Sequence, residues 1–451
     1  MLDKLGKMLP AIEEPKYALK FRTRLMWIGI ILILFLVMGQ IPLYGVAPET
    51  YERFKYMQLV LASKMGTLMT LGISPIVMAS IILQLLVGAK ILPLDLTKPE
   101  DRIKFQDMQK IVTVLFCIFE GTVYVLFGVI KPGSPDIFTI LLLIAQLSFG
   151  GFLVLLMDEV IHKWGVGSGI SLFIAAGVSQ TIFVRALNPF TMGAELPAGA
   201  VPRFITALGI GEIGTAIDAI IPVIATVIVF LIVVYVQGIK VEIPLAFGSL
   251  SGFGRRWPLK FIYTSNIPVI LTAALLANFH LFGTMIHNPW IAQYDSSGNV
   301  IGGLLYYLSM PRGLILSIIH GTITTGMILQ AIGYVLFMAI GATLFSILWI
   351  YTSGMDPRSV AEQIKSIGFQ IPGFRRDPRI IEQVLARYIP PLALMGGLFV
   401  GLLAAFADFT GALGTGTGIL LTVMIIYNFY EEISRRYVEE MHPELRKFFG
   451  R

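Results

Sequence analysis

Residues 67–86, TLMTLGISPIVMASIILQLL, form an apolar stretch that contains a helix breaker. Gly72 and Pro75 lie where a membrane-spanning helix would otherwise be continuous. Proline has no amide donor and disfavours helical geometry in the residue before it. Because every backbone polar group in lipid needs a partner, we expect a helix that begins late and lies against protein or a water-filled cavity. Residues 265–270, SNIPVI, make a similar break in another apolar stretch, although a tolerated kink would explain either break alone.

The composition is that of a membrane protein with many spans. Of the 451 residues, 56% are hydrophobic and only 14% are charged, whereas a soluble domain carries roughly 25% charged residues. The single cysteine, Cys117, lies inside an apolar run, which excludes a disulfide framework. The five histidines show no spacing typical of a metal site, and we predict neither a metal nor a cofactor.

Apolar segments of about 20 residues recur along the chain, and each is long enough to cross roughly 30 Å of hydrocarbon. The sequence therefore predicts an all-α polytopic membrane protein with ten transmembrane helices. The ten segments lie near 25–42, 68–89, 111–130, 137–157, 168–187, 214–237, 264–286, 325–350, 388–407 and 411–430.

The distribution of basic residues predicts the orientation of these spans. If the N-terminus is inside, 27 of the 34 Lys and Arg residues fall in segments on the cytoplasmic side. Short cytoplasmic segments carry such an excess of positive charge in membrane proteins. We therefore expect both termini in the cytoplasm.

Ten spans divide into two halves of five, and an odd number of spans makes the second half inverted relative to the first. Both breaks fall in the second span of their half, and interrupted spans at matching positions of inverted repeats indicate the functional site of a transport protein. A secondary transporter of small solutes is therefore one hypothesis, but aliphatic residues flank the breaks and Glu120 is nearly the only acid deep in a span. Motifs of zinc proteases, serine hydrolases and nucleotide-binding loops do not occur, so we predict no enzyme.

Six stretches, taken in chain order, resemble the SecY family, the large subunit of the protein-translocation channel. Its eukaryotic counterpart is the alpha subunit of the Sec translocon, and KVEIPLAFG is similar to the archaeal and eukaryotic form. Residues 188–213 and 287–320 are least similar. The six stretches are TLGISPIVMASIILQLLVG, GVGSGISLFIAAGVSQTIF, KVEIPLAFG, PLKFIYTSNIPVIL, RYIPPL and GALGTGTGILLTV.

The resemblance implies a protein-conducting channel in which the two inverted five-helix halves close around a central pore. Unfolded polypeptides would cross the membrane through it, and hydrophobic segments would leave sideways into lipid. The expected domains are a cytoplasmic amphipathic segment (1–24), a first half (25–187) with a plug near 48–66, an external linker loop (188–213), a second half (214–430) with cytoplasmic loops near 238–263 and 351–387, and a cytoplasmic tail (431–451).

The resemblance also implies an aliphatic ring that narrows the pore. Such a collar can dewet and block ions, although each of these side chains would ordinarily be read as core packing. The ring positions are Ile73, Val77, Ile170, Ile174, Ile270 and Leu421. A short plug helix would fill the outer funnel, unless the same residues form a helix lying on the membrane surface. Its core is Tyr56, Met57, Gln58, Leu59, Val60, Leu61, Ala62, Ser63, Lys64 and Met65.

By the resemblance, spans two and seven line a lateral gate through which signal sequences reach lipid. Glu120, in span three, lies near this gate by topology and should be protonated or hydrogen-bonded, because an ionised acid in a span costs about 2.5–3.5 kcal/mol. We predict Asn266 as its partner, with an unrelated backbone group as the alternative.

Two long basic loops are expected on the cytoplasmic side. Anionic lipid alone could explain their charge, but in the family these loops dock the ribosome, whose phosphates arginine can bind. The docking residues are Arg255, Arg256, Arg375 and Arg376. The resemblance further implies a small SecE or gamma subunit, a third small subunit of the beta or SecG class, contact with signal sequences, nascent chains and membrane lipids, and a plasma-membrane location.

Overall fold

The computed structural model is mostly helical and divides by its contacts into two units. Unit 1 comprises Met1–Ala79, Asp107–Ile228 and Gly411–Arg451, and unit 2 comprises Ser80–Gln106 and Val229–Thr410. The structure describes residues 10, 12–17, 19–50, 64–88, 91–94, 99–191, 196–247, 254–264, 266–286, 288–294, 300–311, 313–366, 369–370 and 378–441.

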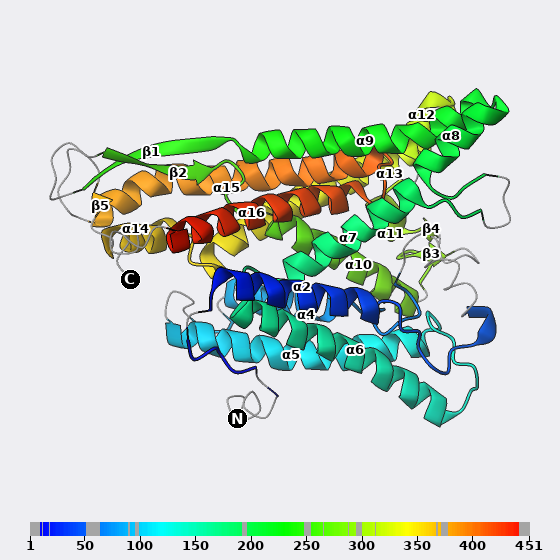
Figure 1. Cartoon of the computed structure of the whole chain (residues 1–451), viewed down its shortest axis with the longest axis horizontal. Helices are drawn as coiled ribbons and strands as arrows, with labels where there is room; N and C mark the ends of the chain where they lie inside the picture. The colour runs from blue at the N-terminus through cyan, green and yellow to red at the C-terminus, as the bar shows by residue number, and fades with distance from the viewer. Residues whose placement is uncertain are drawn as a thin grey trace. The chain divides into compact units, whose positions relative to one another are not determined.

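A helix covers most of each predicted span (Figure 1). Among the described residues, seven helices are long and apolar enough to cross a membrane, and three further apolar helices are shorter, at Ser74–Val87, Ala200–Ile210 and Ile267–His280. The main helices are α2 (Phe21–Met38), α4 (Ser74–Gly88), α5 (Pro99–Leu126), α6 (Ile137–Trp164), α7 (Gly169–Leu187), α9 (Ile213–Gln237), α10 (Ile267–Ile286), α13 (Thr325–Thr352), α15 (Pro378–Phe409) and α16 (Gly416–Met441).

Both predicted breaks are confirmed as late helix starts. Gly72 adopts a left-handed φ of +54°, α4 begins only at Ser74, and Pro75 lies in its first turn. Proline is well tolerated there, because the first amides of a helix have no partner within it. The helix α10 begins in the same way at Ile267, with Pro268 in its first turn.

Two helices begin well before their predicted spans. The helix α5 begins at Pro99 and α15 at Pro378, about ten residues before the apolar segments at 111–130 and 388–407. Their first turns carry charged side chains, such as Glu100 and Asp101 in α5. A hydropathy window finds only the apolar part of such a helix, which is why the prediction was too short.

The core of unit 1 lies where α2, α6 and α7 meet. Phe35 of α2 and Phe173 of α7 are buried and stacked, with ring centres 4.6 Å apart. At Gly150 of α6, a side-chain carbon would lie 1.9 Å from the carbonyl oxygen of Leu68. Only glycine fits there, so the segment that leads into α4 lies directly against α6.

The core of unit 2 is built on close contact between α13 and α15. At Gly397 of α15, a side-chain carbon would lie 2.7 Å from the Cβ atom of Ser346 in α13. The Ser346 hydroxyl donates to the carbonyl of Ala393 at 2.7 Å and lies 2.8 Å from the Thr264 hydroxyl. Small residues let membrane helices approach closely, and hydroxyl groups then link them.

The all-α prediction is wrong for the segment that follows α9. Strands β1 (Lys240–Phe247) and β2 (Gly254–Lys260) form an antiparallel pair, and β5 (Phe369–Gln370) joins β1 on its other side. The side chains of β1 alternate between aliphatic or aromatic and other types, the period of a strand. This signal was present in the sequence, but hydropathy alone does not detect it.

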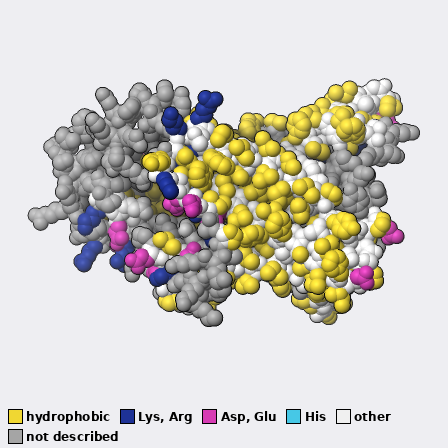
Figure 2. All heavy atoms as spheres, turned by 60° about the horizontal axis from the view of Figure 1, so that its bottom comes forward, with side chains coloured by type: hydrophobic (Ala, Val, Ile, Leu, Met, Phe, Trp, Pro, Cys, Tyr) yellow, Lys and Arg dark blue, Asp and Glu magenta, His cyan; other side chains and the backbone are white. Residues whose placement is uncertain are grey.

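The predicted external loops also contain regular structure. Residues 188–213 include α8 (Ala200–Ile210), and residues 287–320 include strands β3 (Gln293–Tyr294) and β4 (Val300–Gly302) with the short helices α11 (Leu304–Leu308) and α12 (Leu314–Ile319). Residues 1–9, 11 and 18 of the predicted N-terminal amphipathic segment lie outside the described residues. On the face shown in Figure 2, hydrophobic side chains form a broad band and most charged side chains lie beside it, as expected where a protein meets lipid.

Candidate functional site

The break before α4 brings a buried acid and a hydroxyl together in unit 1. Glu120 of α5 is 1% exposed, and the Ser74 hydroxyl donates to its Oε1 atom at 3.2 Å. Burying a carboxyl group is costly unless it is hydrogen-bonded, so the expectation that Glu120 has a hydrogen-bond partner is confirmed. The partner we predicted, Asn266, precedes α10 in unit 2, and that pairing stays a prediction.

The predicted ring residues are divided between the units, five in unit 1 and Ile270 in unit 2. Ile73 and Ile170 are half-buried and pack against one apolar cluster, which includes Phe173. Val77 and Leu421 are buried, at 4% and 6% exposure. Ile174, one turn after Ile170 on α7, is half-buried. The ring itself stays a prediction.

The start of α7, which carries Ile170 and Ile174, is fixed by an acid at the end of α6. The Asp158 carboxylate accepts the Ile170 amide at 2.9 Å. At Gly169, a side-chain carbon would lie 2.7 Å from Asp158 Oδ1. The carboxylate thus satisfies an amide of the first turn that has no partner within the helix.

The last residues of the predicted plug core adjoin the α2–α7 core. The ammonium nitrogen of Lys64 lies 3.7 Å from the centre of the Phe35 ring, a cation–π contact. Burial lowers the pKa of Lys64 to about 8, whereas the ring, which attracts the cation, acts in the opposite direction. Met65 packs against a second apolar cluster, which includes Leu43 and Leu147. Residues 56–63 lie outside the described part of the chain.

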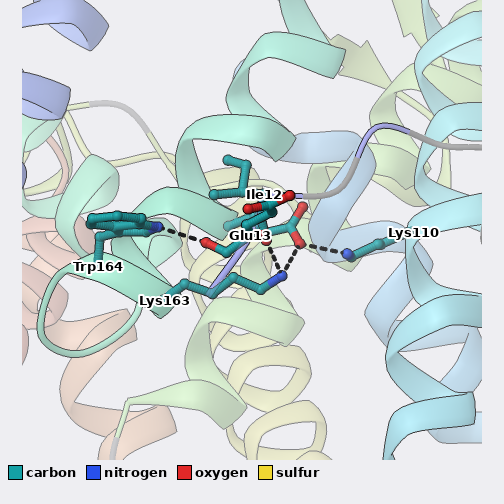
Figure 3. A network of polar contacts seen from close by, with 6 residues as sticks. Ile12, Glu13, Lys110, Lys163 and Trp164 are labelled. Atoms are coloured by element: carbon teal, nitrogen blue, oxygen red, sulfur yellow. Dashed lines mark hydrogen bonds and ion pairs between the residues drawn. The ribbon is translucent and has the colours of Figure 1, made fainter. Parts of the chain in front are cut away.

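A charged network lies near the end of α6, and residues beside it form hydrogen bonds with the N-terminal segment (Figure 3). Glu159 is 8% exposed and accepts from Lys110 of α5 at 2.7 Å and from Lys163 at 2.8 Å. Lys163 also donates to the carbonyl of Ile12, and the Trp164 indole donates to that of Glu13 at 2.9 Å. The sequence showed an acid near the end of a span but not its partners, because Lys110 and residues 12–13 are distant from Glu159 along the chain.

The predicted docking residues are described only in part. Arg255 and Arg256 lie on strand β2, opposite Leu245 and Pro244 of β1. Arg375 and Arg376 lie outside the described residues.

Comparison with known proteins supports one family for the whole chain. Residues 67–430 match the family described as SecY, and residues 33–66 match the plug domain of Sec61p. The chain belongs to the SecY family. SecY-family relatives include the protein translocase subunit SecY of Pyrococcus furiosus, 45% identical over 99% of this chain and 98% of that protein. The subunit of the same name from Methanococcus vannielii is also 45% identical, with the same coverage.

Solved structures of SecY-type channels share this fold. One, described as a protein conducting channel, has a TM-score of 0.83 at 43% identity and covers 98% of this chain and 99% of its own. Sec61 in the canine ribosome-channel complex from the endoplasmic reticulum has a TM-score of 0.79 at 42% identity, with the same coverage. The SecY family is not a family of enzymes, and nothing in these likenesses favours a transporter of small solutes.

Proposed function

We propose that this protein is the channel-forming subunit that moves unfolded polypeptides across a membrane and releases hydrophobic segments sideways into lipid. The observation that carries the proposal is likeness over nearly the whole chain, at 43% identity, to a solved protein-conducting channel. Residues 67–430, which match the SecY family, include every apolar helix after α2 and both breaks.

The proposed channel has ten spans in two inverted halves, with an aliphatic constriction formed by the six ring residues. Its seal depends on the absence of polar groups, since water held there would have too few partners. The burial of Val77 and Leu421 and the shared cluster of Ile73 and Ile170 support an apolar constriction in unit 1. An aliphatic collar also offers no fixed hydrogen bonds to a passing chain of arbitrary sequence.

The plug proposal concerns residues 56–65. Support comes from the match of residues 33–66 to a plug domain and from the contact between Lys64 and Phe35, which would hold one end of the plug to α2. The gate proposal concerns Glu120 and Asn266. The buried hydrogen bond from Ser74 to Glu120 supports it, because Ser74 begins the broken second span.

The proposed topology places both termini in the cytoplasm of a cell whose plasma membrane holds the channel. The partners are a small SecE or gamma subunit, a third small subunit of the beta or SecG class, and the ribosome. A ribosome-bound relative at 42% identity supports the last of these. Arg255, Arg256, Arg375 and Arg376 would bind ribosomal phosphates.

Reconstitution tests the function directly. The complex, purified from native membranes and placed in vesicles, should protect a secretory polypeptide from external protease when a translating ribosome or another driving partner is present. A second polypeptide with a long apolar segment should become extractable only with detergent. If the vesicles took up a labelled small solute but neither protected the first polypeptide nor retained the second, the result would instead support the secondary transporter.

A further inference from the structure

The outer surface of unit 2 contains an apolar hollow between α13 and α15. Its volume is about 410 Å³, within the range of roughly 300–1,000 Å³ that is typical of small-molecule sites. The hollow is lined by Ile347 and Tyr351 of α13 and by Pro390, Pro391, Leu394 and Met395 of α15. Among the described residues, the Tyr351 phenol is the one titratable group in its lining, so the lining suits a hydrocarbon chain.

The walls of the hollow are outward-facing, but its floor is the core of unit 2. Tyr351 is 63% exposed and Met395 is 47% exposed. Ile350, which also lines the hollow, is 3% exposed and belongs to the apolar cluster that holds α14 (Pro357–Ser366) against α15. A molecule in the hollow would therefore touch both the surrounding lipid and the side chains that pack α14 against α15.

Two prolines create a local need for hydrogen-bond donors at the rim. Pro390 and Pro391 supply no amide hydrogen, so the carbonyl oxygens four residues earlier, at positions 386 and 387, lose their α-helical donors. In a membrane such groups must be satisfied by other partners. A ligand that carries hydroxyl groups next to its hydrocarbon can supply them.

Positive charge lies at the same end of the hollow. Arg387 is exposed and lies one turn before Pro391, which places both on one face of α15. Arg358 follows Pro357, a wall residue, and its side chain is 75% exposed. Its ion pair with Glu362, at 3.4 Å between exposed groups, is of a kind that contributes little. Tyr351 adds an aromatic ring of the type that gathers where hydrocarbon meets headgroups.

We propose that this hollow binds one anionic glycerophospholipid, with a hydrocarbon chain between α13 and α15 and its phosphate at Arg387 and Arg358. The apolar lining takes the chain, the arginines take the charge, and headgroup hydroxyls reach the carbonyl groups before the two prolines. The site needs only that α13 and α15 cross a membrane, so it goes beyond the proposed function and does not depend on polypeptide conduction.

Occupancy should stabilise the end of unit 2 that carries the sheet. The hollow shares Ile350 with the cluster that includes Leu259 of β2, and the Tyr263 hydroxyl donates to the carbonyl of Met355, just before α14, at 2.9 Å. A ligand that binds the folded state raises its stability. The lipid would thus hold α14 and the strands in place.

The experiment uses the full chain with its natural subunits in nanodiscs and phosphatidylglycerol with a diazirine near the end of one chain. We expect photolabelling of Leu394, Met395 or Tyr351, displaced by unlabelled phosphatidylglycerol and much less by phosphatidylcholine. Arg387→Gln and Arg358→Gln should each weaken labelling about fivefold, the effect of one basic residue at an anionic surface. Met395→Trp should abolish it by filling the hollow.

Two controls separate a site from general lipid contact. Lys365→Gln removes another exposed cation two turns along α14, about 10 Å away, and Phe406→Trp enlarges an exposed side chain on α15 about three turns beyond the hollow. Both control variants should be photolabelled to the same extent as the parent. Equal labelling by the two lipids, equal loss in the controls, or labelling of another subunit in place of these residues would each overturn the proposal. Unaltered thermal unfolding of the parent with added phosphatidylglycerol would also contradict it.

Discussion

The ammonium group of Lys64 lies 3.7 Å from the centre of the Phe35 ring, and Phe35 in turn stacks on Phe173. A lysine at the end of the predicted plug is thus joined, through one aromatic ring, to the α2–α7 core of unit 1. This contact would attach one end of the predicted plug to α2.

The first prediction is that Lys64 and Phe35 are energetically coupled. Lys64→Met, Phe35→Leu and the double variant should give a coupling free energy of about 0.5–2 kcal/mol, the range of cation–π contacts from exposed to desolvated sites. Chemical unfolding of the purified complex measures it. Phe116 on α5, whose ring lies edge-on to that of Phe119 with centres 6.1 Å apart, supplies a Phe→Leu control for the loss of an aromatic ring. Additive losses at Lys64 and Phe35 would show that the contact contributes nothing.

The second prediction concerns pH. The pKa of Lys64 is lowered to about 8 by burial, from an ordinary value of 10.5. Between these two pH values the unfolded chain binds more protons at this residue, so the contribution of Lys64 to stability rises with pH. Below pH 8 both states are protonated, and the full cost of burying the charge remains. The unfolding temperature of the parent, relative to Lys64→Met, should therefore increase from pH 7.5 to pH 10, and a constant difference would contradict the assignment.

The third prediction concerns the gate. Ser74→Ala removes the donor to buried Glu120 and should shift the balance between closed and open gate by about 0.6 kcal/mol, the average for hydrogen bonds between membrane helices. Signal-sequence insertion efficiency is the measurement. A double-mutant cycle between Glu120→Leu and Asn266→Leu tests the predicted pair in the same assay, and additive effects would argue against direct contact.

The fourth prediction concerns the ring. Replacement of Ile73, Ile170 and Ile270 by Asn, singly and together, should let water into the aliphatic constriction. The ion conductance of the idle complex in planar bilayers should therefore rise with the number of replacements. Ile426→Asn and Ile340→Asn serve as controls, since both side chains are more than half exposed on outward faces of their own units. If the ring variants fold and conduct no more ions than the parent, these residues do not form the constriction. The series should be repeated with residues 56–65 deleted, because the plug can mask a leak.

The fifth prediction concerns docking. Reversing the charge of Arg255 and Arg256 together, or of Arg375 and Arg376 together, should weaken binding of translating ribosomes. Raised salt should cause a similar loss in the parent, because phosphate contacts release counterions. Lys365→Glu, in the last turn of α14, is the matched control. Unchanged binding at moderate salt in both double variants would show that these arginines have another role.

The sequence by itself determined the class of protein, the helical segments and the two late helix starts. Hydrophobicity over about 20 residues and the missing amide of proline act locally, so Pro75 and Pro268 located the breaks before any tertiary contact was known. The long collinear motifs also determined the family. Helix ends were less certain, because α5 and α15 continue into polar residues for which hydropathy gives no signal.

Only the tertiary structure decided which side chains meet. Glu120 finds Ser74, which is 46 residues away, and Glu159 finds Lys110 on another helix, because a buried charge is satisfied by whichever donor the packing brings within about 3 Å. The contact of Lys64 with Phe35 and the hollow beside Pro390 likewise depend on how segments distant in sequence come together. A linear pattern records which residues are polar or apolar, but not the distance between two of them in the folded chain.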